Sequence, residues 1–545
     1  MLKLSLARNR VNLPAFRIPS IVSSAERNPT IAIKVRRQIL FLLLSLIWFG
    51  HRAASQSNSG DQEAHIQRIE ARAVYLALSA SEPPLQLSLQ KLMELYKIPG
   101  FSIAVIDNYK IAWAKAYGVT DVDSKTPVTT KTLFQAGSIS KPVAATGALL
   151  LVEQGKLSLD EDVNLKLKTW KVPANEYTTT QKVTLRRLMS HTAGLTVHGF
   201  PGYDVDAPLP ALVQVLNGEK PANTEPIRVD TVPGTMERYS GGGVTIEQQL
   251  MIDVTGKPFP EFMHEAVLEK IGMNDSSYQQ PLPANRTHYT AAGTYPDGKP
   301  VHGRWHVYPE MAAAGLWTTP TDLAKFAIEI ALSKQGKANH VLSQKMTNEM
   351  LTPVKDEVAL GFFLDEPNPG VFGHSGADEG FQAMLTMNAK TGEGLIFMTN
   401  SDRGLLAGQF VLRTVSDEYK WTQSWGPQTL PELLLIAKTN GTSAALRRYT
   451  EVKASSGKGA GIDESTLNML GYTLLEDGQT QEAITVFQRN VQEYPQSSNV
   501  YDSLGEACLK AGQKDMAITN YKKSLQLDPK NQNAVEVLRK LKAEN

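Results

Sequence analysis

Two residues in the first third of the chain have the types and the spacing needed for nucleophilic catalysis. Ser138 and Lys141 stand three residues apart in the segment Phe-Gln-Ala-Gly-Ser-Ile-Ser-Lys, directly before an alanine-rich run at residues 142–155. Residues three apart at the start of a helix lie on one face. A serine hydroxyl becomes nucleophilic when a neighbouring base takes its proton, and an amine in apolar surroundings loses its own proton more readily than in water. The spacing therefore predicts a serine nucleophile with a lysine base, although the four-residue pattern also arises by chance.

Two later segments carry groups that could complete such a site. Tyr239 opens the segment Tyr-Ser-Gly-Gly-Gly, in a loop before an expected helix, where its phenol could relay protons to and from a leaving group. His374 opens the segment His-Ser-Gly-Ala and could polarise or orient a substrate. Gly376 would let a substrate approach the backbone closely. The N–H groups of Ala377 and Ser138 could together hold an oxyanion. Each segment alone is also compatible with a purely structural loop.

The order of these motifs resembles that of the serine β-lactamases and penicillin-binding proteins, whose class C pattern is Ser-x-x-Lys, Tyr-x-Asn and Lys-Thr-Gly. The matching motifs here are Ser138–Lys141, Tyr239–Gly241 and His374–Gly376. Three further segments look like this family and extend the resemblance over about residues 85–400; they are residues 99–105, 188–195 and 314–319.

The resemblance implies an α+β fold, with an antiparallel sheet and a helical subdomain, and an acyl-enzyme mechanism without cofactor or metal ion. Ser138 would attack a carbonyl carbon, while Lys141 and Tyr239 would handle its proton. His374 would orient the substrate. The N–H groups of Ser138 and Ala377 would hold the oxyanion, and water would then release the acyl group.

Two motif positions depart from the family pattern. Gly241 stands where the family has asparagine, so the amide that would bind a β-lactam side chain is missing. His374 stands where the family has lysine, and an imidazole is mostly neutral at pH 7. We therefore expect hydrolysis of an ester, amide or peptide bond in a small-molecule or peptide substrate, ahead of β-lactam hydrolysis. The alternative is a non-catalytic sensor of cell-wall fragments or a scaffold. His191, within residues 188–195, is interpreted as a structural loop residue.

A different serine-hydrolase fold is excluded by the residues that come after its motif. Gly373, Ser375 and Ala377 approximate the nucleophile elbow of α/β-hydrolases. That fold needs a helix after the serine and a histidine further along the chain. Residues 382–387 instead have the pattern of a strand, and no histidine follows His374.

The elements that must position these residues can be predicted from the apolar pattern. Strands are expected at residues 101–106, 111–117, 382–387 and 394–400. Helices are expected between the two strand pairs, at residues 142–155, 185–190, 245–255 and 323–333. Strand pairs at both ends with helices between them predict an α+β hydrolase domain, assigned to residues 68–425, whose sheet is assembled from the two ends of that segment.

The C-terminal part of the chain is helical in pattern and repeats every 34 residues, the period of the tetratricopeptide repeat. Five positions recur at this period; they are Leu470–Gly471 and Leu504–Gly505, Gly478 and Gly512, Ala483 and Ala517, Phe487 and Tyr521, and Pro495 and Pro529. We expect a helical connector at residues 426–454, a flexible linker at 455–461, and two repeats with a capping helix at 462–545. Such repeats could dock a protein partner.

The composition excludes several other classes of function. With 545 residues, 42% of them hydrophobic, and a net charge of +1, nothing favours a nucleic-acid partner. The single cysteine, Cys508, excludes a disulfide framework and a cysteine-based zinc site. Its position in the repeats indicates a small buried residue.

The N-terminal pattern is typical of a secretory signal. Arg36 and Arg37 precede an apolar run at residues 39–50, which small residues at 53–55 follow. We expect a signal peptide at residues 1–55 and a tether at 56–67, with export to the periplasm or the medium. The run is shorter than the ~20 residues that span a bilayer, so no permanent membrane span is expected after cleavage.

Overall fold

The structure, a computed structural model, describes residues 60–78, 83–421, 429–455 and 462–543. By their contacts the residues form two units, Met1–Gln67 and Arg68–Asn545, and the second unit contains the sheet and the candidate site. The predicted signal peptide lies outside the described residues, as does nearly all of the predicted linker at 455–461. Within the described ranges, no helix is long and apolar enough to cross a membrane.

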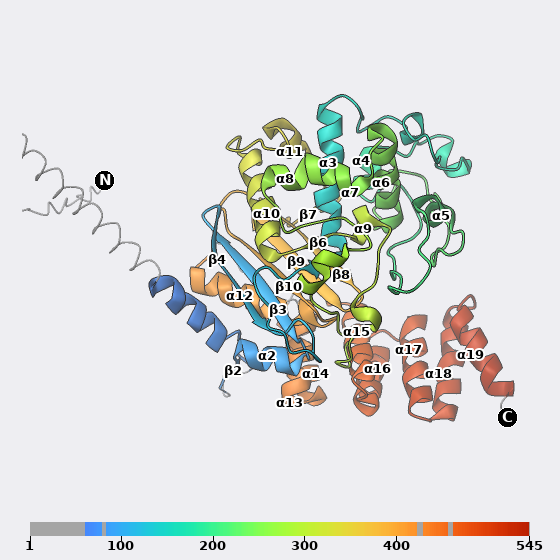
Figure 1. Cartoon of the computed structure of the whole chain (residues 1–545). Coiled ribbons are helices and arrows are strands. Elements are labelled where there is room, and N and C mark those ends of the chain that lie inside the picture. Colours follow the sequence, from blue (N-terminus) through green and yellow to red (C-terminus); the bar gives the residue numbers. More distant parts are fainter. Residues whose placement is uncertain (1–59, 79–82, 422–428, 456–461, 544–545) are drawn as a thin grey trace, which may run out of the picture. The chain divides into compact units, whose positions relative to one another are not determined.

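The core of the second unit is one antiparallel sheet of six strands in the order β4–β3–β10–β9–β8–β7 (Figure 1). The strands are β3 (Gly100–Asp107), β4 (Lys110–Gly118), β7 (Phe363–Leu364), β8 (Val371–Asp378), β9 (Phe381–Asn388) and β10 (Gly394–Thr399). β10 pairs with β3 in a register that places Ile396 opposite Ala104. Strands from the two ends of the domain therefore form one sheet, which confirms the predicted assembly.

Both faces of the central strands are covered by helices. Every residue of β10 is buried, as is every residue of β3 before Asp107. This explains why their sequences are continuous apolar runs rather than alternating ones. α10 (Pro320–Lys334) contacts β3, β9 and β10, and α12 (Gly404–Tyr419) contacts β9 and β10.

Between β4 and β7 the chain forms the helical subdomain. Besides α10, its helices are α3 (Ser140–Glu153), α4 (Leu185–Met189), α5 (Leu212–Asn217), α6 (Gly241–Thr255), α7 (Phe259–Met263), α8 (Glu269–Ile271), α9 (Met311–Ala314) and α11 (Gln344–Met350). α3 contacts α6, α9 and α11 and is buried on all sides from Ser140 to Leu151. A helix that is apolar all round belongs in the interior, and this placement carries Lys141 into the core.

Two short strand pairs complete the domain. β1 (Val74–Leu76) pairs with β2 (Leu85–Leu87), which α2 (Leu89–Leu95) follows. β5 (Phe134–Gln135) pairs with β6 (Trp317–Thr318). The second pair matters for the site because it holds the turn that begins at Ala136 beside the segment that ends α9.

The C-terminal region is a series of antiparallel helices. They are α13 (Thr429–Asn440), α14 (Thr442–Ser455), α15 (Glu464–Glu476), α16 (Thr480–Glu493), α17 (Ser498–Lys510), α18 (Lys514–Leu527) and α19 (Gln532–Ala543). The repeated small residues allow the helices of each pair to approach. A Cβ on Gly471 would lie 2.5 Å from the ring of Phe487, and one on Gly505 would lie 3.1 Å from that of Tyr521. Cys508 is buried in α17, as expected.

One acidic residue links α15 to two basic side chains outside this helix. Asp477, at the end of α15, accepts a hydrogen bond from Arg403 at 2.9 Å and pairs with Lys438. The Arg403 side chain is only 5% exposed, so this carboxylate compensates a guanidinium that has little access to water.

Candidate active site

The candidate nucleophile and base are in direct contact. Ser138 lies in the 3₁₀ turn η2 (Gly137–Ile139), and Lys141 lies in the first turn of α3. The Lys141 Nζ donates a hydrogen bond to the Ser138 Oγ at 2.8 Å and a second one to the Ala313 carbonyl oxygen at 2.8 Å. Lys141 is 4% exposed. The predicted pair thus shares one face, with the amine held by α9 and shielded from solvent.

The chain on both sides of Ser138 is hydrogen-bonded to Leu316. The Ala136 N–H donates to the Leu316 carbonyl oxygen at 2.9 Å, and the Leu316 N–H donates to the Ser140 Oγ at 3.0 Å. These bonds fix the turn against the family-like segment at residues 314–319. The hydroxyl of Ser138 is therefore presented by a rigid turn rather than by a loose loop.

Two glycines bring this turn against β8. Gly137 has a φ of +50°, and a Cβ there would lie 2.5 Å from the Ala377 nitrogen. A Cβ on Gly376 would lie 1.9 Å from the Ala136 carbonyl oxygen. Only glycine tolerates such approaches. The N–H groups of Ser138 and Ala377 are consequently on adjacent backbone segments, as an oxyanion hole requires.

The His-Ser-Gly motif lies within a strand, which the strands expected at residues 382–387 and 394–400 did not include. His374, Ser375 and Gly376 are all part of β8 and pair with β9 along their length. Glycines usually indicate turns or bulges. Here Gly376 meets the need for close contact with the serine turn, a long-range constraint that local sequence does not reveal.

His374 is a neutral imidazole that donates a hydrogen bond from Nδ1 in this structure. Its Nδ1 bonds to the Ser375 carbonyl oxygen, which can only accept, so the ring proton is on Nδ1. Its Nε2 is buried without a hydrogen-bond partner. Burial, together with the charge of Lys141, lowers the pKa of His374 to about 3. The position that carries a cation in the family pattern is thus uncharged here.

Tyr239 lies next to Lys141 and His374, directly before α6. Its ring centroid is 5.0 Å from the Lys141 Nζ and 6.2 Å from the His374 ring. Ser240 caps α6, since its Oγ accepts a hydrogen bond from the Gly243 N–H at 3.0 Å. The structure therefore brings all four predicted catalytic side chains together: Ser138, Lys141, Tyr239 and His374.

Three further rings around Tyr239 were not predicted. His191 lies 4.3 Å, His198 4.9 Å and Phe363 6.2 Å from the Tyr239 ring centroid. The interpretation of His191 as a structural loop residue was incomplete, because it contacts a candidate catalytic side chain. The only signal for it in the sequence was its place in a family-like segment.

A buried carboxyl group near Lys141 was also missed. Glu247 lies in α6, is 1% exposed, and its Oε1 has no hydrogen-bond partner. Burial raises the pKa of Glu247 to about 8, against the opposing effect of the Lys141 charge. The side chain is therefore protonated in the folded protein at neutral pH.

This titration predicts how stability depends on pH. The folded protein keeps a proton on Glu247 up to a pH of about 8, whereas the unfolded chain releases this proton above the ordinary pKa of 4.5. The free energy of unfolding therefore decreases as the pH rises from 4.5 to about 8. We expect Glu247→Gln to gain stability relative to the wild type by about 1.4 kcal/mol for each pH unit in that window. Urea unfolding at pH 5 and pH 8 measures the difference. Glu357→Gln, at an exposed glutamate, should show none, and a pH-independent difference for Glu247→Gln would contradict the assignment.

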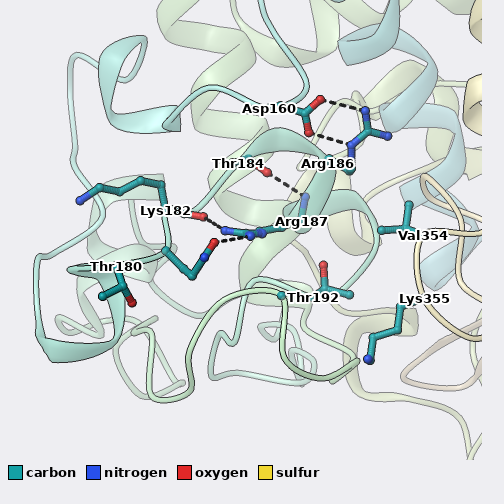
Figure 2. A pocket seen from close by; sticks show the side chains of 11 residues that line it. Asp160, Thr180, Lys182, Thr184, Arg186, Arg187, Thr192, Val354 and Lys355 are labelled. Carbon is teal, nitrogen blue, oxygen red and sulfur yellow. Dashed lines mark hydrogen bonds and ion pairs between the residues drawn. The ribbon is translucent and has the colours of Figure 1, made fainter.

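Among the hollows on the described surface, one is lined by a predicted catalytic residue. A hollow of about 400 Å³ is lined by His374, Phe363 and Thr386, among others. Another, of about 500 Å³, lies around Arg186 and Arg187 (Figure 2). There Arg186 pairs with Asp160 and Arg187 bonds to neighbouring oxygens of its own segment, so the cations are already satisfied. Neither hollow is lined by Ser138, Lys141 or Tyr239.

Comparison with known proteins agrees with this geometry. The family model described as beta-lactamase matches residues 86–413, and that of the tetratricopeptide repeat matches residues 498–531. A β-lactamase from Pseudomonas fluorescens is 30% identical over 242 residues, 44% of this chain and 62% of that protein. Protein flp from Staphylococcus aureus (strain N315) is 25% identical over 317 residues, 56% of this chain and 60% of that protein. The chain thus spans about three fifths of these relatives.

Two solved structures align with a comparable part of the chain. The octameric penicillin-binding protein homologue from Pyrococcus abyssi is 23% identical, with a TM-score of 0.49 over 61% of this chain and 78% of that one. The D-alanine carboxypeptidase AmpC from Burkholderia cenocepacia is 22% identical, with a TM-score of 0.46 over 59% and 96%.

The fold and the matched motifs place the chain in the serine-hydrolase superfamily, with a β-lactamase/transpeptidase-like fold followed by a helical region that contains a tetratricopeptide repeat. Because the family model covers well over half of its length, the chain belongs to the β-lactamase family.

Proposed function

We propose that this protein is a serine hydrolase that forms an acyl-enzyme at Ser138 and cleaves an ester, amide or peptide bond in a small, uncharged or peptide-like substrate. The observation that carries the proposal is the 2.8 Å contact between the Ser138 Oγ and the Lys141 Nζ inside a buried turn. In its unprotonated form the Lys141 amine would accept the hydroxyl proton as the serine oxygen attacks the carbonyl carbon.

The surrounding residues supply the other steps. The N–H groups of Ser138 and Ala377 receive the negative charge that develops on the carbonyl oxygen. The proton passes from Lys141, with Tyr239 as relay, to the departing oxygen or nitrogen, and the bond to the leaving group breaks. Water then attacks the acyl-enzyme in the same way and regenerates the Ser138 hydroxyl.

Gly376→Ala tests the oxyanion hole. The added methyl group would lie 1.9 Å from the Ala136 carbonyl oxygen, so β8 and the serine turn must separate. We expect kcat to fall by about 100- to 1000-fold, the cost of losing an oxyanion donor, with a smaller change in KM. Gly505→Ala, in the repeats, controls for lost packing alone. A Gly376→Ala variant with wild-type kcat would rule out this pair of donors.

Because His374 is neutral, we expect the third motif to favour substrates that place no carboxylate beside it. In the family pattern a lysine there supplies a fixed cation, and Gly241 removes the amide of the second motif as well. The test is a substrate panel of nitrocefin, p-nitrophenyl butyrate and a D-Ala-D-Ala peptide on the wild type and on Ser138→Ala. We expect the ester to be the best substrate, and nitrocefin as the best substrate would contradict the proposal.

His374→Lys should shift this preference. A restored cation would attract the nitrocefin carboxylate, and we expect kcat/KM for nitrocefin, relative to that for p-nitrophenyl butyrate, to rise by about tenfold, which corresponds to about 1.4 kcal/mol. His374→Gln keeps the position polar and neutral and should leave the ratio low. Equal ratios in the two variants would show that charge at this position does not select the substrate.

We also propose that the protein is exported and that its repeats dock a protein partner. The support for export is the basic and apolar pattern at residues 36–55, and the support for a partner is the matched tetratricopeptide repeat. Fractionation of the native host's cells tests the first, and recovery in the cytoplasmic fraction would contradict it.

A further inference from the structure

The ring of Tyr239 contacts two imidazoles that lie seven residues apart in the connection between α4 and α5. The His191 ring is 4.3 Å from it with a tilt of 39°, and the His198 ring is 4.9 Å from it with a tilt of 48°. His191 is 4% exposed, whereas His198 is exposed. The phenol that is proposed to relay protons is therefore in contact with two rings, and neither ring is part of the three motifs.

This connection adopts an unfavourable backbone conformation at two positions near the rings. His191 has a φ of 56° and Val197 a φ of 61°. Residues other than glycine seldom adopt this left-handed region, and a β-branched residue there is a genuine outlier. Such conformations persist only when surrounding contacts determine them, and they concentrate at functional sites.

Four backbone N–H groups on either side of Tyr239 bond to this connection. The Arg238 N–H donates to the His191 carbonyl oxygen at 2.8 Å, and the Ser240 N–H donates to the His191 Nδ1 at 3.2 Å. On the other side, the Gly241 N–H donates to the His198 carbonyl oxygen at 2.9 Å, and the Gly242 N–H donates to the Val197 carbonyl oxygen at 3.0 Å. The connection that contains His191 and His198 is thus hydrogen-bonded to the residues on both sides of the tyrosine.

His191 is neutral, as expected of a residue that supports the phenol without adding charge to the site. Since the Nδ1 accepts a hydrogen bond from Ser240, the proton of the neutral ring is on Nε2. Burial, with the nearby charge of Lys141, holds the pKa of His191 well below its usual range. The ring therefore adds no positive charge beside the phenol and the amine.

We propose that His191 and His198 are positioning residues that clamp the Tyr239 phenol against the Ser138–Lys141 pair. This inference rests on the proposed function, because it assigns the two rings to the alignment of the proton relay. A shift of about 1 Å in a catalytic group can cost about 100-fold in rate, so each ring should affect kcat through Tyr239 rather than through substrate binding.

Four variants distinguish the effect of losing a ring from the effect of losing the hydrogen-bond acceptor. His191→Asn keeps an acceptor near the Nδ1 position and tolerates a positive φ, but it removes the ring. His191→Phe keeps a ring and removes the acceptor. His198→Ala removes the exposed ring, and His198→Phe restores one. His302→Ala, at an exposed histidine that pairs with Asp206, is the matched control.

The measurement is kcat and KM for p-nitrophenyl butyrate, in the wild-type background and in the Tyr239→Phe background, with a thermal melt of every variant. We expect His191→Asn and His198→Ala to lower kcat by about tenfold with little change in KM, His198→Phe to recover most of the loss, and His302→Ala to match the wild type. With Tyr239→Phe present, the same substitutions should change kcat by less than about twofold, because their effect passes through the missing hydroxyl.

The outcomes distinguish the clamp from the proposed function. Equal losses of kcat with and without the Tyr239 hydroxyl would mean that the two rings only support the fold, and would overturn the clamp alone. A wild-type protein that neither hydrolyses the ester nor reacts with a fluorophosphonate would overturn the proposed function and the clamp together.

Discussion

Ser138→Ala will abolish covalent labelling by a fluorophosphonate and reduce kcat for p-nitrophenyl esters by about a million-fold, the loss seen when a serine nucleophile is removed. The reason is that Lys141, Ala377 and Tyr239 can all remain in place without an oxygen to attack the carbonyl carbon. The measurement is gel fluorescence of the labelled protein together with steady-state kinetics.

The matched control for this variant is Ser375→Ala. Ser375 belongs to the third motif, but its side chain is exposed in β8, whereas His374 and Gly376 on either side of it are buried. It is the serine that an α/β-hydrolase elbow would use, so labelling should persist when it is replaced. Labelling that survives Ser138→Ala and is lost in Ser375→Ala would show that Ser375 is the nucleophile. A wild-type protein that resists labelling would favour the alternative of a non-catalytic sensor.

Lys141→Met will lower kcat by about 100- to 10,000-fold, the range contributed by a general base. Methionine fills a similar volume in the buried position but cannot accept the hydroxyl proton. It also leaves the Ala313 carbonyl oxygen without its 2.8 Å partner, which should cost about 1–3 kcal/mol of folding stability. Activity must therefore be measured on folded protein, well below the melting temperature of the variant.

A second substitution at this position distinguishes charge from basicity. Lys141→Arg retains a cation that stays protonated at any accessible pH. If Lys141 acts as a base, the arginine variant should be as inactive as the methionine variant. If the arginine variant keeps more than about a tenth of the wild-type kcat, the amine serves only as an electrostatic support, and the proton must pass elsewhere.

The parts of the fold that depend on local pattern could be predicted from the sequence. Apolar runs gave β3 and β10 because buried central strands need continuous apolar residues. The alanine-rich run gave α3, and the 34-residue period gave the helical pairs of the C-terminal region. The Ser138–Lys141 contact followed from spacing alone, since three residues within one turn leave little freedom.

The rest of the site depends on contacts between segments far apart in the chain. Nothing local indicates that His191 and His198 contact Tyr239, because their connection is placed by hydrogen bonds to the backbone at the start of α6. Glu247 in α6 resembles an ordinary helical glutamate until its burial is known. The state of His374 likewise depends on one bond to Ser375 that sequence does not specify.

The most direct test of the acyl-enzyme mechanism is to find the acyl group itself. The wild-type protein is mixed with a slowly hydrolysed p-nitrophenyl ester, quenched in acid, digested with trypsin and mapped by tandem mass spectrometry. The peptide of interest spans residues 132–156 and contains both Ser138 and Ser140. The mechanism predicts the acyl mass on Ser138, and its absence in Ser138→Ala. An acyl group on any other residue, or turnover of the ester with no trapped adduct, would contradict it.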